Sequence, residues 1–113
     1  MKKTSAYLPF TTYALRALGT QIAVARRELG WTAADLAQRL GVTAQVVSRI
    51  EHGASSTSVG TVIEAAVLCG IPLFQTDPDD VRAMATVTEN ERMRLALLPA
   101  RTRRRSVEVS SDF

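Results

Sequence analysis

The sequence has little cysteine and few aromatic residues: one cysteine among 113 residues, and 5% Phe, Trp and Tyr. A single cysteine excludes an internal disulfide framework, and the single histidine leaves no Cys/His cluster with zinc-binding spacing. No run of about 18 apolar residues is present, which excludes a transmembrane helix. The two N-terminal lysines are not followed by the apolar segment of a secretory signal. We therefore expect a cytoplasmic protein that holds no metal and no cofactor.

Hydrophobic residues make up 46% of the chain, enough for one modest core built from Ala, Leu, Val and Ile. The net charge of +3 is mild and suggests an anionic partner. Residues 1–76 carry seven Lys and Arg against four acidic residues, whereas residues 77–113 carry seven of each. The whole net charge therefore lies in the first two thirds of the chain.

Apolar residues recur at steps of three and four from Thr12 to Leu29, which predicts one helix ended by Gly30. Residues 1–10 lack this periodicity and contain Pro9, so we expect a flexible N-terminal arm there. The domain that follows is expected to span residues 11–76.

Two short helices are predicted next. Thr32 is placed to cap the first, which Gly41 stops, and Thr43 is placed to cap the second, which runs to about Glu51. Two short helices joined by a turn of this length predict a helix-turn-helix. If the second helix docks through Val47 and Ile50, four of its side chains face outward: Ala44, Gln45, Ser48 and Arg49. A helix of this kind fits the major groove of DNA.

The rest of the chain predicts further elements. Ser58 is placed to cap a helix from Val59 to about Cys69, with Val62, Ile63, Ala66 and Val67 facing inward. Residues 71–75 are apolar and form a short strand or a single turn, of which we favour the strand. Asp77-Pro78-Asp79-Asp80 is a strong helix start for an extension over 77–98, and a second capping box at Thr88–Glu91 allows a break in it. The tail, 99–113, is expected to be disordered when free.

The run Ala34–Thr43, the Ser48–Gly53 end of the third helix and the following loop and helix together resemble the Xre/Cro family of DNA-binding domains. The resemblance covers about residues 13–76. It implies an all-α, five-helix fold and a dimeric repressor that binds a palindromic operator in double-stranded DNA. No catalytic set and no phosphate-binding loop is apparent, so we do not expect an enzyme.

The family pattern implies roles for individual residues. Gln45 would pair with adenine and Arg49 with guanine, and an ion pair would join Arg26 to Glu51. The residues at base-contacting positions are Thr43, Ala44, Gln45 and Arg49. The residues expected at the DNA backbone are Thr32, Arg39, Ser48, Ser55 and Ser56.

Three further segments resemble HipB-type antitoxins, whose cognate toxins are HipA-like serine/threonine kinases. They are Gly30-Trp31-Thr32, Leu68–Phe74 and the tail from Leu97 to Phe113. In that group the apolar segment after the fourth helix pairs with its twin across a dimer, which makes Ile71, Leu73 and Phe74 the candidates for that contact. The resemblance implies an antitoxin that represses its own type II toxin-antitoxin operon.

The tail has two interpretations. It is either a solvated terminus or a toxin-binding element, in which case the contacting residues would be Arg103, Arg104, Arg105, Val107 and Phe113. The function likewise has two alternatives. One is a stand-alone Xre-type regulator of the phage or mobile-element kind, and the other is an interaction adaptor that does not bind DNA.

Overall fold

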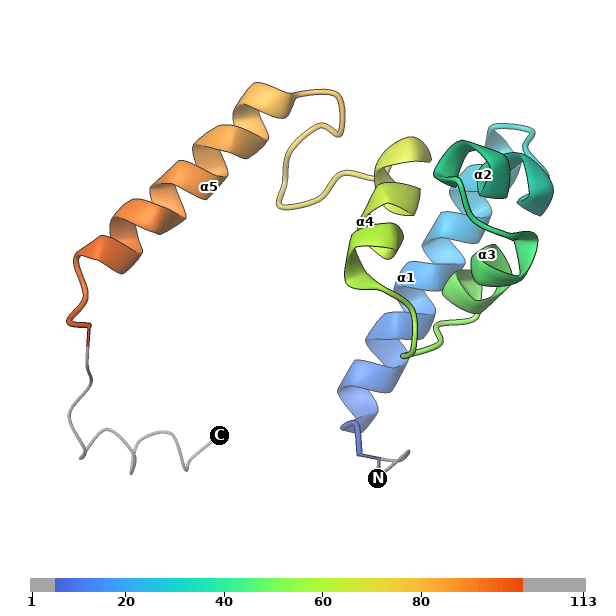
Figure 1. The fold of residues 1–113 in the computed structure, drawn as a ribbon, viewed down its shortest axis with the longest axis horizontal. Helices are drawn as coiled ribbons and strands as arrows, with labels where there is room; N and C mark the ends of the chain where they lie inside the picture. The colour runs from blue at the N-terminus through green and yellow to red at the C-terminus, as the bar shows by residue number, and fades with distance from the viewer. Residues whose placement is uncertain (1–5, 101–113) are drawn as a thin grey trace. The chain divides into compact units, whose positions relative to one another are not determined.

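The computed structural model describes residues 6–100, and their regular structure is helical (Figure 1). Five helices follow one another along the chain: α1 (Pro9–Glu28), α2 (Ala33–Leu40), α3 (Ala44–Glu51), α4 (Val59–Leu68) and α5 (Val81–Ala96). The described part of the chain contains no strand, only one isolated bridge between Leu73 and Thr76. The predicted all-α class is confirmed. The chain divides into two compact units after Asp80.

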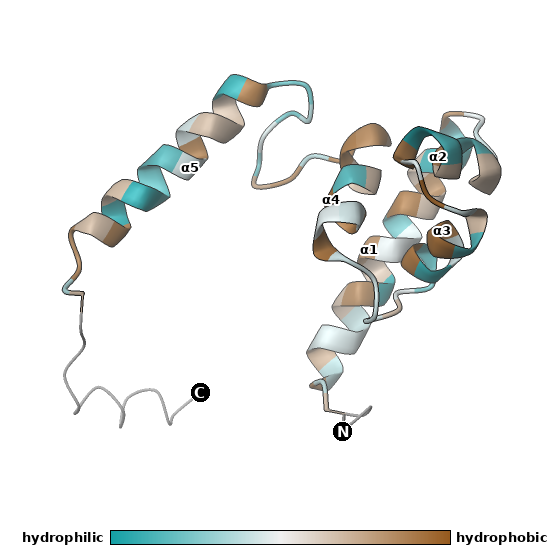
Figure 2. Ribbon diagram, viewed as in Figure 1, coloured by the Kyte–Doolittle hydropathy of each residue, from teal (hydrophilic) through white to brown (hydrophobic). Residues whose placement is uncertain are grey.

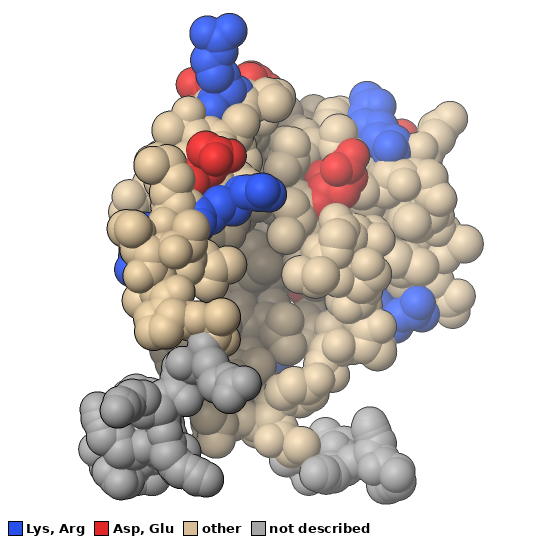
Figure 3. Space-filling view, turned by 60° about the vertical axis from the view of Figure 1, so that its left-hand side comes forward, with Lys and Arg blue, Asp and Glu red and all other residues tan. Residues whose placement is uncertain are grey.

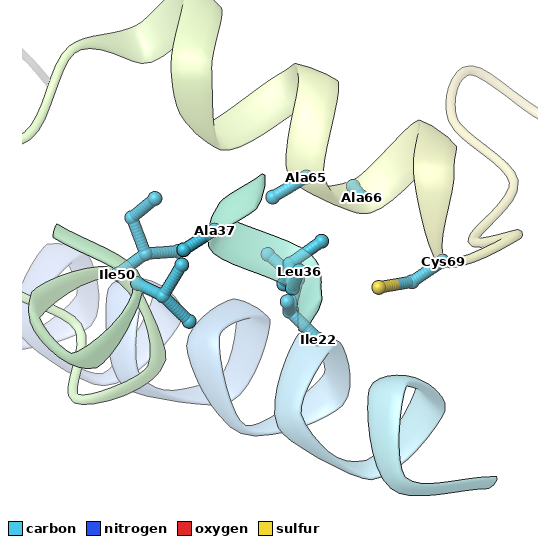
Figure 4. Close-up of a cluster of buried hydrophobic side chains, with 8 residues drawn as sticks. Ile22, Leu36, Ala37, Ile50, Ala65, Ala66 and Cys69 are labelled. Carbon is cyan, nitrogen blue, oxygen red and sulfur yellow. The ribbon is translucent and has the colours of Figure 1, made fainter. Parts of the chain in front are cut away.

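The first unit is built around a small aliphatic core. In this unit α3 packs against both α1 and α2, and α2 also contacts α4. Each of the four helices contributes to the cluster of buried side chains shown in Figure 4. The cluster consists of Ile22, Leu36, Ala37, Val47, Ile50, Ala65, Ala66 and Cys69. Four of these side chains are small, which lets the helices approach one another closely.

Helix α1 begins earlier than the sequence pattern predicts. It starts at Pro9 rather than near Thr12, with proline in the first turn, where its fixed φ suits a helix and its missing N–H has no intrahelical partner to lose. Further along, Gly19 is buried against α3. A Cβ atom at this position would lie 2.3 Å from the carbonyl oxygen of Ile50. The glycine therefore allows the backbones of α1 and α3 to touch.

The predicted caps of the three short helices are confirmed. Thr32 Oγ1 accepts a hydrogen bond from the backbone N–H of Asp35 at 3.0 Å, and the Asp35 carboxylate accepts one from the backbone N–H of Thr32 at 2.8 Å. This reciprocal pair is a capping box. Thr43 Oγ1 accepts from the N–H of Val46, and Ser58 Oγ from that of Thr61.

Helix α4 buries only part of the face predicted: Ala66 is buried and Val62 packs against the core, as predicted. Ala65, Ala66 and Cys69 are buried, whereas Ile63 and Val67 are 42% and 36% exposed. The prediction that Ile63 and Val67 point inward is wrong. The residues that replace them are smaller, and a small side chain on the inner face brings α4 closer to the other helices.

The predicted strand over 71–75 is also wrong. Leu73 and Thr76 flank a two-residue turn, and the N–H and hydroxyl of Thr76 both donate to the carbonyl oxygen of Leu73, at 2.9 and 2.7 Å. The two turn residues, Phe74 and Gln75, have φ of 53° and 59°. This left-handed backbone reverses the chain at once and leaves no length for a strand.

The second unit is described by helix α5 alone. It begins at Val81, later than the predicted start at Asp77. The side chain and carbonyl of Asp77 instead accept from the N–H groups of Asp79 and Asp80, which makes a turn before the helix. The helix runs unbroken through the predicted capping box, and the Thr88 hydroxyl donates back to the carbonyl of Met84 instead of capping a new helix. None of the residues of α5 is buried, and Figure 2 shows hydrophilic residues along much of its length.

Candidate nucleic-acid interface

The turn between α2 and α3 has the geometry that a helix-turn-helix needs. Helix α2 ends at Gly41, whose φ of 74° lies in the left-handed region that glycine adopts at little cost. The N–H of Val42 then donates to the carbonyl of Ala37 at 3.0 Å, which closes the helix end. Thr43 caps α3 directly afterwards, so three residues reverse the chain.

Helix α3 has one buried face and one exposed face. Val47 is fully buried and Ile50 is 3% exposed. The exposed side chains come from the first two turns and lie on one side of the helix: Ala44, Gln45, Ser48 and Arg49. Thr43 is exposed at the helix start. The structure therefore brings the sequence-predicted base-contacting residues together on one solvent-facing surface.

The residues predicted at the DNA backbone are exposed around this surface, and three of them already have contacts within the protein. The Ser48 hydroxyl lies 3.5 Å from Nδ1 of His52. The Thr32 hydroxyl and N–H are held in the capping box. These hydrogen bonds hold the pKa of the Asp35 carboxyl below its usual value. Arg39 lies over the Trp31 ring, with its guanidinium carbon 4.1 Å from the ring centroid. Ring stacking orients this arginine but leaves its N–H groups free to meet a phosphate.

Sequence reasoning did not identify the role of Trp31. Residues 31 and 39 stand too far apart in the chain for helical spacing to pair them, so no sequence signal was available. The loop after α3 exposes Ser55 and Ser56, and the hydroxyl of Thr57 donates to the carbonyl of Ala54 at 3.1 Å to hold that loop. Both serine hydroxyls can therefore donate outward from a braced loop.

The ion pair implied between Arg26 and Glu51 is present. Arg26 Nε donates to Glu51 Oε2 at 2.6 Å and Arg26 Nη2 to Glu51 Oε1 at 3.0 Å. A third N–H, on Nη1, donates to the carbonyl of Trp31 at 2.8 Å. The hydrogen bond to Glu51 raises the pKa of Arg26 above its usual value. One buried guanidinium thus ties α1 to the end of α3 and to the entry of α2.

Cys69 takes no part in this surface. It is buried in the core, and burial raises the pKa of its thiol, so the reactive thiolate is disfavoured. Within residues 6–100 no group of His, Cys, Asp and Glu side chains could hold a metal ion. The same residues include no helix that is long and apolar enough to cross a membrane.

Comparison with known families supports this interpretation of the surface. The family model described as "Helix-turn-helix" matches residues 22–75. These residues are a helix-turn-helix domain. The domain takes in the last seven residues of α1 and all of α2, α3 and α4, and the fold is of the Xre/Cro kind. No curated protein and no solved structure matches the chain.

The match to this family supports a DNA-binding transcription regulator. The part of α1 before residue 22 lies outside the matched range. The sequence also predicts residues for a dimer contact and for toxin binding. Ile71 and Leu73 pack against the core and only Phe74 is exposed, at 68%. The tail residues Arg103, Arg104, Arg105, Val107 and Phe113 lie outside the described residues.

Proposed function

We propose that the protein is a sequence-specific repressor that reads DNA with the exposed face of α3. The observation that carries the proposal is the division of α3 into a docked face, Val47 and Ile50, and a polar free face that carries Gln45 and Arg49. An amide side chain pairs bidentately with adenine and a guanidinium with guanine in the major groove. Ala44 adds an apolar contact that suits a thymine methyl group.

Contacts to phosphate would hold this helix in register. Thr32, Arg39, Ser48, Ser55 and Ser56 are all exposed. Only one of them is a cation. Figure 3, which shows another side of the molecule, likewise has separate Lys and Arg side chains with Asp and Glu beside some of them. Few cations mean few released counterions, so binding should depend only modestly on salt. Base contacts then supply much of the discrimination.

The test begins with selection of binding sequences from random DNA by the full-length protein. Arg49→Ala should weaken binding to the selected site about 10- to 100-fold, since a bidentate base contact is worth about 1–3 kcal/mol. It should also relax the preference at one base pair. Arg82→Ala removes the same charge from α5 and is the matched control. Equal losses in the two variants, or an unchanged footprint for Arg49→Ala, would contradict base reading by α3.

At a finer level, we propose an antitoxin of the HipB type, a cytoplasmic protein that represses its own operon and neutralises a HipA-like kinase. The support is the resemblance of Gly30-Trp31-Thr32, Leu68–Phe74 and the tail to that group. The toxin would be bound by the tail, through Arg103, Arg104, Arg105, Val107 and Phe113.

Co-expression with a kinase gene from the same operon tests the antitoxin proposal. The full-length chain should copurify with the kinase, whereas a chain cut after Pro99 should lose the kinase and keep its affinity for DNA. A large loss of DNA affinity on truncation would assign the tail arginines to phosphate instead. If the full-length chain captures no kinase, the stand-alone regulator is the better description.

A palindromic operator requires two copies of the protein, with half-sites about one DNA turn apart. The contact predicted for these copies is Ile71, Leu73 and Phe74. Ile71 and Leu73 are partly buried against the core of their own chain. Of the three, Phe74 is the exposed side chain that could contact a second copy. A larger contact surface is needed for a stable dimer.

A further inference from the structure

Helix α1 exposes an apolar surface on the side away from the core. We call Phe10, Tyr13, Ala17 and Val24 the outer stripe. Phe10 is 81% exposed, Tyr13 68% and Val24 50%, and Ala17 is exposed as well. Their spacing of three, four and seven residues places them on one side of the helix, in the pattern by which two helices pack along each other.

The outer stripe is unusual for a free surface. The aromatic side chains of Tyr7, Phe10 and Tyr13 are half of the six in the chain, and all three are exposed in and just before the first turns of α1. In the stretch from Pro9 to Ala25 the only charged residue is Arg16. Contiguous exposed apolar surface of this kind marks an interaction site.

We propose that the outer stripe is the surface through which two copies of this chain associate. The inference rests on the proposed function, because a palindromic operator supplies the reason for two copies. A two-fold contact places the same surface of both copies together, so a charge close to the symmetry axis would face its like. The absence of charge along the stripe removes that repulsion and favours a second copy over a charged partner.

The available area also fits a second copy. A Phe or Tyr side chain buries about 150–250 Å² when fully covered. Phe10 and Tyr13 are 81% and 68% exposed, so together they offer roughly 220–370 Å². Ala17 and Val24 add to this area within the stripe. Tyr7 and Leu8, 56% and 71% exposed just before α1, supply further apolar surface next to it, towards the roughly 800 Å² per partner of a standard specific interface.

A contact through α1 would also control the spacing of the two recognition helices. Gly19 brings the backbone of α1 against the carbonyl of Ile50 in α3, and a Cβ at Gly53 would lie 2.8 Å from the backbone of Arg16. Backbone contacts this close leave no freedom for α1 to slide along α3. Two copies joined through their α1 helices would therefore present their α3 helices at a fixed separation, as half-sites require.

Analytical ultracentrifugation of the full chain without DNA tests the proposal. The double variant Phe10→Glu, Tyr13→Glu should raise the dimer dissociation constant at least about 100-fold, because buried aromatic residues dominate interfaces of this kind. Val59→Glu is the matched control, since Val59 is an apolar residue 74% exposed on α4. Circular dichroism should show unchanged helix content in both variants, because all three positions are exposed.

A cross-linking measurement gives a second readout. Residue 17 lies midway between residues 10 and 24, so the two copies of Ala17 face each other whether the helices run parallel or antiparallel. Ala17→Cys should form a disulfide-linked dimer under mild oxidation, whereas Ala34→Cys, exposed on α2, should not. The native Cys69 is buried and should stay reduced.

The proposal is overturned if the wild-type chain is monomeric at micromolar concentrations, or if the double variant remains a dimer while Phe74→Glu or Val59→Glu disperses it. Both measurements are made without DNA. Failure of the proposed DNA reading would appear separately, as a wild-type dimer that selects no DNA sequence. The two failures can therefore be told apart.

Discussion

The two units of the molecule show how differently a helix can be stabilised. In the first unit four helices share a core of eight buried hydrophobic residues. In the second unit α5 has no buried residue along its sixteen positions. The side-chain contacts described within α5 are local: the hydroxyls of Thr86 and Thr88 donate to carbonyls one turn earlier, and Arg94 pairs with Glu91 at 3.2 Å.

The two units therefore differ in how much free energy of burial stabilises their helices. Tertiary burial stabilises short helices that would not persist alone, such as the eight-residue α2 and α3. A helix of α5's length with only local bonds is marginal in water. The surface proposed to read DNA therefore lies on the stable unit, and α5 is the part whose helicity we expect to respond most readily to a partner.

The largest effect expected from this comparison is in the core. Leu36 is fully buried, so Leu36→Ala should lower the free energy of unfolding by about 4 kcal/mol, through lost transfer energy and the cavity left behind. Leu95 is 69% exposed on α5, so Leu95→Ala should change the free energy of unfolding by less than about 0.5 kcal/mol. Urea unfolding followed by circular dichroism measures both. Similar losses in the two variants would mean that α5 is packed as tightly as the core.

The two ion pairs offer a second, smaller contrast. The side chains of Arg26 and Glu51 are 7% and 11% exposed, whereas those of Arg94 and Glu91 are 75% and 63% exposed. Glu51→Gln leaves a buried guanidinium without its counter-charge and should cost about 3 kcal/mol. Glu91→Gln should cost no more than about 0.5 kcal/mol. Added salt should reduce the cost of Glu91→Gln and leave that of Glu51→Gln nearly unchanged. Chemical unfolding of both variants at two salt concentrations measures this.

The sequence alone predicted those parts of the fold that local chemistry determines. Thr32, Thr43 and Ser58 cap their helices because a side-chain oxygen near a free N–H needs no tertiary information. The exposed residues of α3 followed in the same way, because once Val47 and Ile50 are docked, helical geometry turns Gln45 and Arg49 outward. Most of the candidate site therefore follows from helical periodicity and capping alone.

The parts that the sequence did not predict depend on packing between helices. Helix α4 is apolar on nearly every side, so periodicity could not choose between the face with Ile63 and Val67 and the face with Ala65 and Cys69. The turn at Phe74 and Gln75 carries neither glycine nor asparagine, the residues that usually mark a left-handed backbone. The exposed apolar side of α1 was not predicted, because the apolar residues that face the core were enough to predict the helix.

The smallest effect we predict concerns the cap of α2 and depends on pH. Hydrogen bonds from Thr32 hold the pKa of Asp35 below its usual value, so the ionised carboxylate stabilises the folded state. Because the folded pKa is depressed, this stabilisation is fully present above the unfolded pKa of about 3.9 and disappears as the pH falls through the folded value. Asp35→Asn should therefore lower the melting temperature near pH 7, and the gap to wild type should close in acid. Thermal unfolding between about pH 7 and pH 2.5 measures the gap; a constant gap over that range would mean that the charge of Asp35 contributes nothing to the cap.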